Sequence, residues 1–306
     1  MSATAVVADD LALPKKRNRV LAKLLKNKSA VLGCAIVLFF VLAAIIGPYL
    51  APFDPIKPSF TSIRKAPSAL FWFGTDELGR DMFSRMLWGA RASILAGVVS
   101  VFIAVVLGVP FGLVAGYFGG WIDAVISRAT DAMLAIPFLI FAIALAAFLG
   151  PSLTNAMIAI GLSAMPIFIR LTRGQVLTVK AEDYVEGARA IGLPDFWILV
   201  RYVLPNVLPP ILVQGTLTIA TAIIAEASLS FLGLGQQPPN PSWGSMLNTA
   251  KNFMDQAPWM SVFPGTAIFL IVLGFNLLGD GMRDALDPRE QPNAQTRINA
   301  HVHHPA

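Results

Sequence analysis

The chain has 306 residues, of which 56% are hydrophobic and only 13% are charged. Soluble proteins average about 25% charged residues, so this composition argues against a soluble protein. The net charge of +5 occurs without a nucleic-acid-binding motif, and basic membrane loops account for it. Apolar runs of roughly 20 residues, long enough to cross a bilayer, recur along the chain. They predict one all-α membrane domain with about six transmembrane helices.

The amino-terminal residues 1–29 are polar and basic, and a continuous apolar run, residues 30–50, follows them. That run is too long for the core of a typical signal peptide, so we predict that it is retained as the first transmembrane helix. Basic segments stay in the cytoplasm, which places residues 1–29 there. Cys34 is the single cysteine, so an internal disulfide and a multi-cysteine metal site are both excluded.

Residues 51–91 form a predicted extracytoplasmic segment, because a cluster of prolines ends the first helix: Pro48, Pro52, Pro55 and Pro58. Near the end of this segment, apolar residues recur at helical spacing: Met82, Phe83, Met86 and Leu87. Nearby arginines lie largely off that face, which predicts an amphipathic helix along the membrane surface. Two roles remain open for this helix, structural support and contact with a docking protein.

The core domain is predicted to span residues 92–282. Its first two transmembrane helices are expected at Ser93–Tyr117 and in a stretch that ends near Leu149. Glycines at Gly108, Gly112 and Gly116 favour close helix packing. Charged residues open the second of these helices: Asp123, Arg128 and Asp131. Arg128 and Asp131 have the spacing of an intrahelical ion pair, and these charges form either an interfacial clasp or part of a gate or proton path.

A polar stretch, residues 174–208, separates the next two predicted transmembrane helices, Ala156–Ile169 and one that starts at Pro209 and Pro210. Its first part favours a short helix with small residues on its surface: Gly187, Ala188 and Ala190. Gly192 suits the left-handed position just past a helix end, and Pro194 and Asp195 suit the start of a second helix. Such a bend, with little side-chain bulk, fits a cleft in another protein. An ordinary loop between membrane helices is the alternative.

Glu226 lies near the far end of the helix that starts at Pro209 and Pro210. A carboxylate at membrane depth is costly and is a functional candidate by default. Two roles remain open for Glu226, structural pairing near the outer interface and a place in a gate or substrate path. The Gly- and Pro-rich residues 227–247 predict a non-helical outer segment. Val262–Leu278 is the last predicted transmembrane helix, and residues 283–306 form a cytoplasmic tail.

Six transmembrane helices place both termini in the cytoplasm, and most of the 23 lysine and arginine residues then fall on the inner side. Residues 174–208 are cytoplasmic in this topology. The chain has no Gly-x-x-x-x-Gly-Lys-Ser/Thr motif, so it carries no phosphate-binding loop of that kind. All three histidines lie in the tail: His301, His303 and His304. We therefore expect no metal site and no Ser-His-Asp catalysis within the membrane.

The polar stretch is similar to the Glu-Ala-Ala loop of ATP-binding-cassette importer permeases. That pattern falls on a series of residues with its spacing kept: Glu186, Gly187, Ala188, Gly192, Tyr202, Leu204 and Pro205. Gly187 replaces an alanine of the pattern and Tyr202 an isoleucine, and both changes keep the character of the site. Three further blocks, residues 73–91, 226–247 and 276–289, resemble the C-type permease subunits of dipeptide, oligopeptide and nickel importers.

The resemblance implies a type I importer permease fold in the bacterial cytoplasmic (inner) membrane, with the polar stretch as an ATPase-coupling loop. It also implies a homologous B-type permease, two cytoplasmic ATP-binding subunits that hold ATP and Mg²⁺, and an extracytoplasmic substrate-binding protein. The chain itself is then a pore subunit without a cofactor and not an enzyme. Peptides are the expected substrates, with nickel, glutathione or another small solute as alternatives. A stand-alone secondary transporter competes with this interpretation, but such proteins place ionisable groups near the bilayer midplane, where this chain has few.

Overall fold

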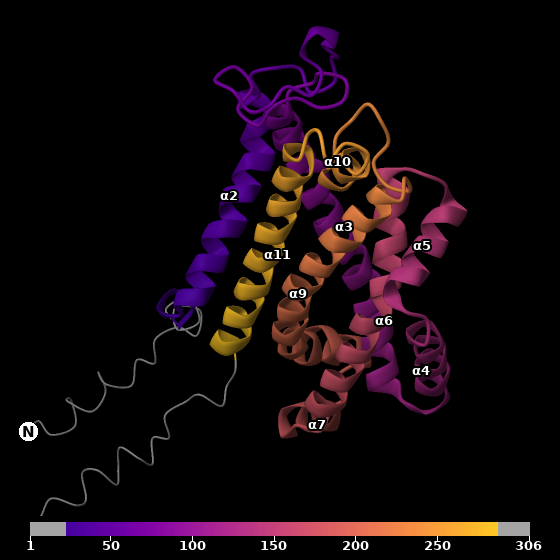
Figure 1. Ribbon diagram of the computed structural model, residues 1–306. Coiled ribbons are helices and arrows are strands. Elements are labelled where there is room, and N and C mark those ends of the chain that lie inside the picture. Colours follow the sequence, from indigo (N-terminus) through magenta and orange to yellow (C-terminus); the bar gives the residue numbers. More distant parts are fainter. Residues whose placement is uncertain (1–22, 287–306) are drawn as a thin grey trace, which may run out of the picture.

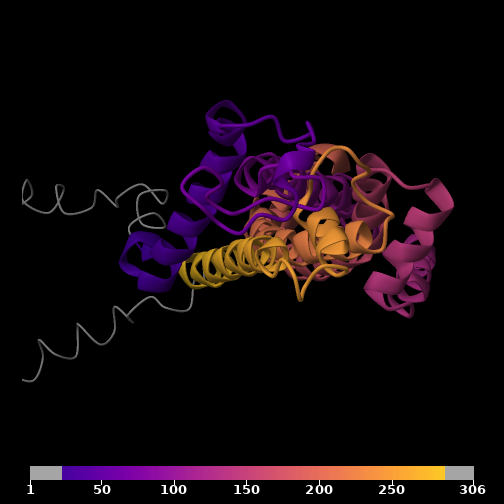
Figure 2. The ribbon, with the colours of Figure 1, turned by 45° about the horizontal axis from the view of Figure 1, so that its top comes forward.

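The computed structural model describes residues 23–286, and within that range the chain folds into helices and loops. Most of the predicted amino-terminal segment, nearly all of the predicted tail and the three histidines lie outside the described residues. Long helices run side by side in Figure 1, and α2 and α11 lie at the opposite side of the bundle from α4 and α5 in Figure 2. The prediction of an all-α fold is confirmed.

Five helical stretches are long and apolar enough to cross a membrane: α2 (Lys28–Leu50), α3 (Met82–Phe118), α6 (Leu153–Val179), Asp195–Phe231 and α11 (Trp259–Leu286). A sixth is added if α4 (Gly120–Leu134) and α5 (Phe138–Leu149), bent by 90° at their junction, form one span. The bend falls at Pro137, which caps α5 and disfavours a helical conformation in the residue before it. The prediction of about six spans is therefore confirmed, although the third is broken.

Helix α3 packs closely on α6 along its glycines. A methyl group added at Gly112 would lie 2.6 Å from the Cβ of Thr172, and one at Gly116 would lie 2.8 Å from the Cβ of Val176. Both distances are shorter than van der Waals contact, so only glycine permits this approach. Lipid tails are as apolar as the helix surfaces, so no hydrophobic effect drives helices together in a bilayer. Helices associate there through close van der Waals contacts of this kind.

The predicted amphipathic surface helix is wrong. Its residues form the first turns of α3, which runs without a break from Met82 to Phe118. Arg80 and Arg85 are buried, and both pair with Asp76, at 2.6 and 3.3 Å from its Oδ2 atom. Arg80 also pairs with Glu77 at 2.6 Å. The spacing of the apolar residues did not reveal these partners, which lie in the preceding loop.

The segment after Glu226 is more helical than predicted. Helix α9 (Leu204–Phe231) continues to Phe231, and α10 (Trp243–Ala250) starts at a capping box formed by Ser242 and Ser245. Trp243 holds α10 against α3, because its backbone N–H donates to Ser93 Oγ and its indole N–H donates to the carbonyl of Met86, both at 3.2 Å. The prediction of a non-helical segment is wrong for these parts of residues 227–247.

The buried ion pairs of Asp76 with Arg80 and Arg85 should contribute to the stability of the chain. Asp76→Ala leaves two buried arginines without their shared carboxylate, and we expect it to lower the free energy of unfolding by about 3 kcal/mol. Asp131→Ala is the matched control, since Asp131 and its partner Arg170 are both 62% exposed. We expect it to cost less than about 1 kcal/mol. Unfolding of the purified chain in mixed detergent–SDS micelles measures both values, and equal losses would contradict the prediction.

Candidate coupling segment

The chain between α6 and α9 lies at the same end of the bundle as the Lys28 end of α2 and the Leu286 end of α11 (Figure 1). We call residues 180–205 the coupling segment. It is shorter than the predicted stretch of 174–208, because α6 extends to Val179 and α9 begins at Leu204 rather than at Pro209. The segment therefore consists of α7 (Asp183–Ala190), a bend, α8 (Asp195–Ile198), a π-helical turn (Leu199–Val203) and the first two residues of α9.

Gly192 makes the bend. Its φ of +75° is the left-handed conformation that glycine adopts without strain. The N–H of Gly192 donates to the carbonyl of Arg189 at 2.9 Å, and the N–H of Leu193 donates to the carbonyl of Ala188 at 3.2 Å. These two bonds form a Schellman motif and satisfy carbonyls that the end of α7 would leave unpaired. Pro194 then caps α8, so the predicted bend at Gly192 and Pro194 is confirmed.

One face of α7 is buried in the bundle and the opposite face is exposed. Val185 and Ala188 belong to the main hydrophobic core, so the prediction that Ala188 lies on the helix surface is wrong. Glu186 and Gly187 are exposed, and a Cβ added at Gly187 would meet no atom within 4 Å. Glycine in a helix costs about 1 kcal/mol relative to alanine. Because the packing of this chain gives no reason for Gly187, a surface outside the chain is the better explanation.

The second helix of the bend is the beginning of a long one. Residues Asp195–Phe231 form one helical run, in which the N–H of Leu204 donates to the carbonyl of Leu199 across a π turn. Pro205 explains this wider turn, because proline lacks an N–H and its ring clashes with the carbonyl four residues earlier. Leu204 packs against the core and Pro205 is exposed. The Leu-Pro pair thus joins the bend to a membrane helix.

Three large apolar side chains at the bend are exposed, and the sequence analysis did not single them out: Ile191 (76%), Phe196 (66%) and Trp197 (54%). Ile198, the next residue, is fully buried. The sequence does contain a signal for this exposure, namely two adjacent aromatic residues at the start of a helix. Only one side of a helix can face the core. Clustered apolar exposure of this kind marks an interaction surface.

Polar contacts fix the coupling segment to the end of α3. The hydroxyl of Tyr117 donates to Asp195 Oδ1 at 2.6 Å, and the guanidinium carbon of Arg189 lies 4.9 Å from the centre of the Tyr117 ring. Lys180 Nζ donates to the carbonyls of Gly116 and Tyr117, each at 3.2 Å. The spacing of residues in the sequence does not reveal the role of Tyr117, because its partners lie more than sixty positions away in the chain.

Two ion pairs join α4 to α6. Arg173 donates to both carboxylate oxygens of Asp123, with Nη2 and Oδ2 2.6 Å apart. Arg170 donates to Asp131 Oδ1 at 2.6 Å. The predicted pair between Arg128 and Asp131 is replaced by the pair with Arg170, and Arg128 is exposed. These pairs have the geometry of a clasp between helices.

Glu226 is fully buried near the end of α9, at 0% exposure. Ser230 Oγ donates to its Oε1 atom at 2.6 Å, whereas Oε2 has no hydrogen-bond partner within residues 23–286. Burial beneath α10 argues against the alternative in which the carboxylate reaches the outer interface. Whether Glu226 acts as a gate stays a prediction.

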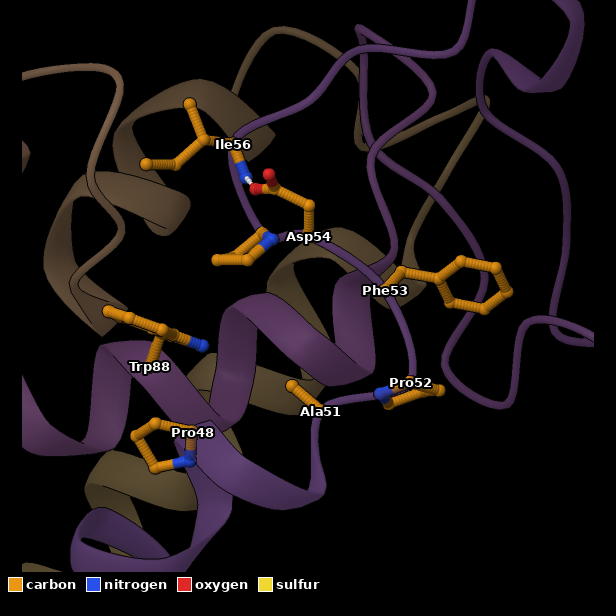
Figure 3. A pocket seen from close by; sticks show the side chains of 8 residues that line it. Pro48, Ala51, Pro52, Phe53, Asp54, Ile56 and Trp88 are labelled. Carbon is orange, nitrogen blue, oxygen red and sulfur yellow. Dashed lines mark hydrogen bonds between the residues drawn. The ribbon is translucent and has the colours of Figure 1, made fainter.

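A hollow of about 490 Å³ opens at the far end of α2 from the coupling segment, beside Trp88 of α3 (Figure 3). Prolines and Ile56 line it, together with one carboxylate, Asp54. Asp54 Oδ1 accepts hydrogen bonds from the N–H groups of Ile56 and Lys57, at 2.8 and 3.3 Å. This carboxylate therefore stabilises its own turn, and the hollow offers no cluster of ionisable groups for chemistry.

Comparison with known proteins identifies the class of protein to which this bundle and bend belong. Residues 108–291 match the family model described as binding-protein-dependent transport system inner membrane component, and the chain belongs to that family. It is a multi-pass permease of the bacterial inner membrane, and membership implies ATPase and substrate-binding-protein partners. Residues 17–67 match the N-terminal transmembrane domain of oligopeptide transport permease C.

Individual relatives cover nearly the whole chain. The chain is 48% identical to the dipeptide transport system permease protein DppC of Alkalihalophilus pseudofirmus, over 87% of this chain and 88% of the relative. It is 42% identical to the glutathione transport system permease protein GsiD of Pectobacterium atrosepticum, over 94% and 96%. An inward-facing structure of the MetNI methionine ABC transporter matches with a TM-score of 0.57 at 19% identity, over 67% of this chain and 98% of that chain. The importer permease fold is therefore confirmed.

Replacing each of two glycines of the coupling segment by alanine should change local stability in opposite directions. Gly187→Ala removes a helix-weakening residue where there is open space, so we expect α7 to gain about 1 kcal/mol. Gly192→Ala forces a side chain into the left-handed conformation, so we expect the bend to lose about 1 kcal/mol. Hydrogen exchange of the amides of residues 185–198 measures both, with slower exchange in the first variant and faster exchange in the second. Changes of the same sign would contradict the prediction.

Proposed function

We propose that this chain forms half of the translocation pore of an ATP-driven peptide importer, and that the coupling segment receives the motion of partner ATPases. The observation that carries the proposal is the outward face of the bend. Glu186 and Gly187 are exposed beside unpaired apolar side chains, and the packing of this chain does not require either residue. A small, exposed corner at the end of a helix bundle fits a cleft in a cytoplasmic partner.

The proposed partners are a homologous B-type permease, two cytoplasmic ATP-binding subunits and an extracytoplasmic substrate-binding protein. ATP and Mg²⁺ bind to the ATPase subunits, so this chain needs no cofactor and catalyses no reaction. It needs two conformations of similar free energy, with the pore open to opposite sides. Partners that bind one conformation more tightly then shift the population.

Peptides are the proposed substrate class. A relative named as a dipeptide permease supports this proposal over one for nickel or another small solute, and a relative named as a glutathione permease supports glutathione as the alternative substrate. The ligand that co-purifies with the partner binding protein tests it. A di- or oligopeptide supports the proposal, whereas a nickel complex or a non-peptide solute contradicts it.

The remaining polar candidates have structural roles in this proposal. Asp131 clasps α4 to α6 through Arg170, and Arg128 lies exposed on the same helix. Glu226 accepts a hydrogen bond from Ser230 one turn further along α9, a contact within that helix. Leu204 and Pro205 transmit the motion of the bend into α9, because they lie in the same helical run as Asp195.

The coupling role predicts a loss of transport without a loss of assembly. Glu186→Lys reverses a charge on the outward face, and Gly192→Trp adds bulk at the corner and strains its left-handed backbone. We expect each to lower ATP-dependent uptake at least tenfold, while the permease inserts and co-purifies with its partners. Uptake of a labelled dipeptide into proteoliposomes measures the effect.

Asp255→Lys is the matched control for the charge reversal. Asp255 is an exposed carboxylate in the loop before α11, at the opposite end of the bundle from the coupling segment, and its reversal should leave coupling unchanged. Normal uptake by both coupling variants, with normal assembly, would refute the proposed role of the segment.

A further inference from the structure

Tyr117 lies in the last turn of α3, buried to 5% exposure, and receives contacts from both helices of the bend. Its hydroxyl donates to Asp195 at the start of α8, 2.6 Å away, and Arg189 at the end of α7 stacks its guanidinium over the ring. A hydrogen bond to a carboxylate is stronger than one between neutral groups, and an exposed cation over a ring adds a smaller contribution. One side chain of α3 thus fixes the two arms of the bend.

Lys180 adds a third contact at the same place. It follows α6 directly and donates from Nζ to the carbonyls of Gly116 and Tyr117, each at 3.2 Å. Carbonyls in the last turn of a helix lack an intrahelical partner and carry the negative end of the helix dipole, so a lysine is favoured there. Contacts from the start, middle and far arm of the coupling segment therefore converge on one turn of α3.

The other contacts of the segment with the bundle differ in kind. Val185, Ala188 and Ile198 pack into the hydrophobic core. Apolar packing of this kind is not directional, so it does not by itself set the angle between the bend and α3. The contacts of Tyr117 have defined directions and fix the angle between the bend and α3.

Helix α3 connects this turn to the opposite end of the bundle. It has 37 residues, continues through Pro110 and carries Arg85 and Ser93 near its start. Arg85 belongs to the buried outer ion pairs, and Ser93 accepts from the backbone N–H of Trp243 in α10. One continuous helix thus joins the turn of Tyr117 to the outer loops and to α10.

We propose that Tyr117 is the joint through which the coupling segment moves α3, a positioning residue for the transport step. The inference rests on the proposed function and names the residue that transmits the motion. When the bend is displaced by an ATPase partner, Asp195 and Arg189 carry Tyr117 with them, and α3 changes its angle in the bundle. Without these contacts the bend moves and α3 stays behind.

The test uses the complete complex in nanodiscs, with ATP hydrolysis measured in the absence and presence of binding protein loaded with a dipeptide. Tyr117→Phe removes the hydroxyl and keeps the ring. We expect basal hydrolysis to persist and the ratio of stimulated to basal hydrolysis to fall about tenfold, the effect that a lost hydrogen bond to a charged group has on an equilibrium. Asp195→Ala should give the same fall, and the double variant should add nothing further.

Two variants control for the chemistry. Asp195→Asn keeps an oxygen that accepts from Tyr117 but loses the charge, so its stimulation should lie between that of the unmodified complex and that of Asp195→Ala. Tyr49→Phe removes a hydroxyl from the exposed outer end of α2 and should change nothing. A residue that only stabilised the fold would lower assembly and basal hydrolysis together, and the ratio would not change.

An unchanged ratio in Tyr117→Phe and Asp195→Ala overturns the inference, and so does a failure of both variants to assemble. Glu186→Lys, measured in parallel, separates this failure from that of the proposed function. If Glu186→Lys uncouples hydrolysis and the Tyr117 and Asp195 variants do not, only the joint is wrong. If none of the three changes the ratio, the coupling role of the segment is contradicted as well. A fall in the Tyr117 and Asp195 variants alone supports the joint and contradicts the role of Glu186.

Discussion

The close approach of α3 to α6 is the contact on which the rest of this structure depends. It exists because glycines on α3 leave room for the backbone of α6: Gly108, Gly112 and Gly116. Lipid tails give helices no hydrophobic reason to associate, so such van der Waals contacts must hold them together. The packing brings the last turn of α3 beside Lys180, at the point where α6 ends and the coupling segment begins. The coupling segment leaves α6 level with the last turn of α3. The α3–α6 packing therefore also places Tyr117 against Asp195.

Charged groups in the chain divide into those that support the fold and those that are available to a partner. Asp76, Arg80 and Arg85 satisfy one another in a buried cluster, where a charge without a partner would be costly. Asp123 and Arg173 link α4 to α6 in a half-buried pair. Glu186 differs from all of these, because it is exposed and lies on a helix face that has no role in the packing of the chain.

The sequence was sufficient for features that depend on local chemistry. Hydropathy located the membrane helices because their length is fixed by bilayer thickness, and Gly192 with Pro194 located the bend because few residues adopt its backbone angles. Features that depend on distant partners were not predictable from spacing. Asp131 pairs with a residue 39 positions away and Tyr117 with one 78 positions away. Ala188 was assigned to the wrong face because a small side chain has little preference for either side of a helix.

The departures from local expectation lie in the segment that we propose as the contact with an ATPase partner. Gly187 weakens a short helix without relieving any contact, and Phe196 and Trp197 expose apolar surface next to a fully buried Ile198. Each would be removed by selection for stability alone, since alanine and polar residues fit these positions better. A docking partner that needs close backbone approach and covers the aromatic side chains accounts for all three. In the proposed complex such a partner contacts the bend from outside while Tyr117 contacts it from inside, so α7 and α8 would pass an external force to α3 at the last turn of that helix.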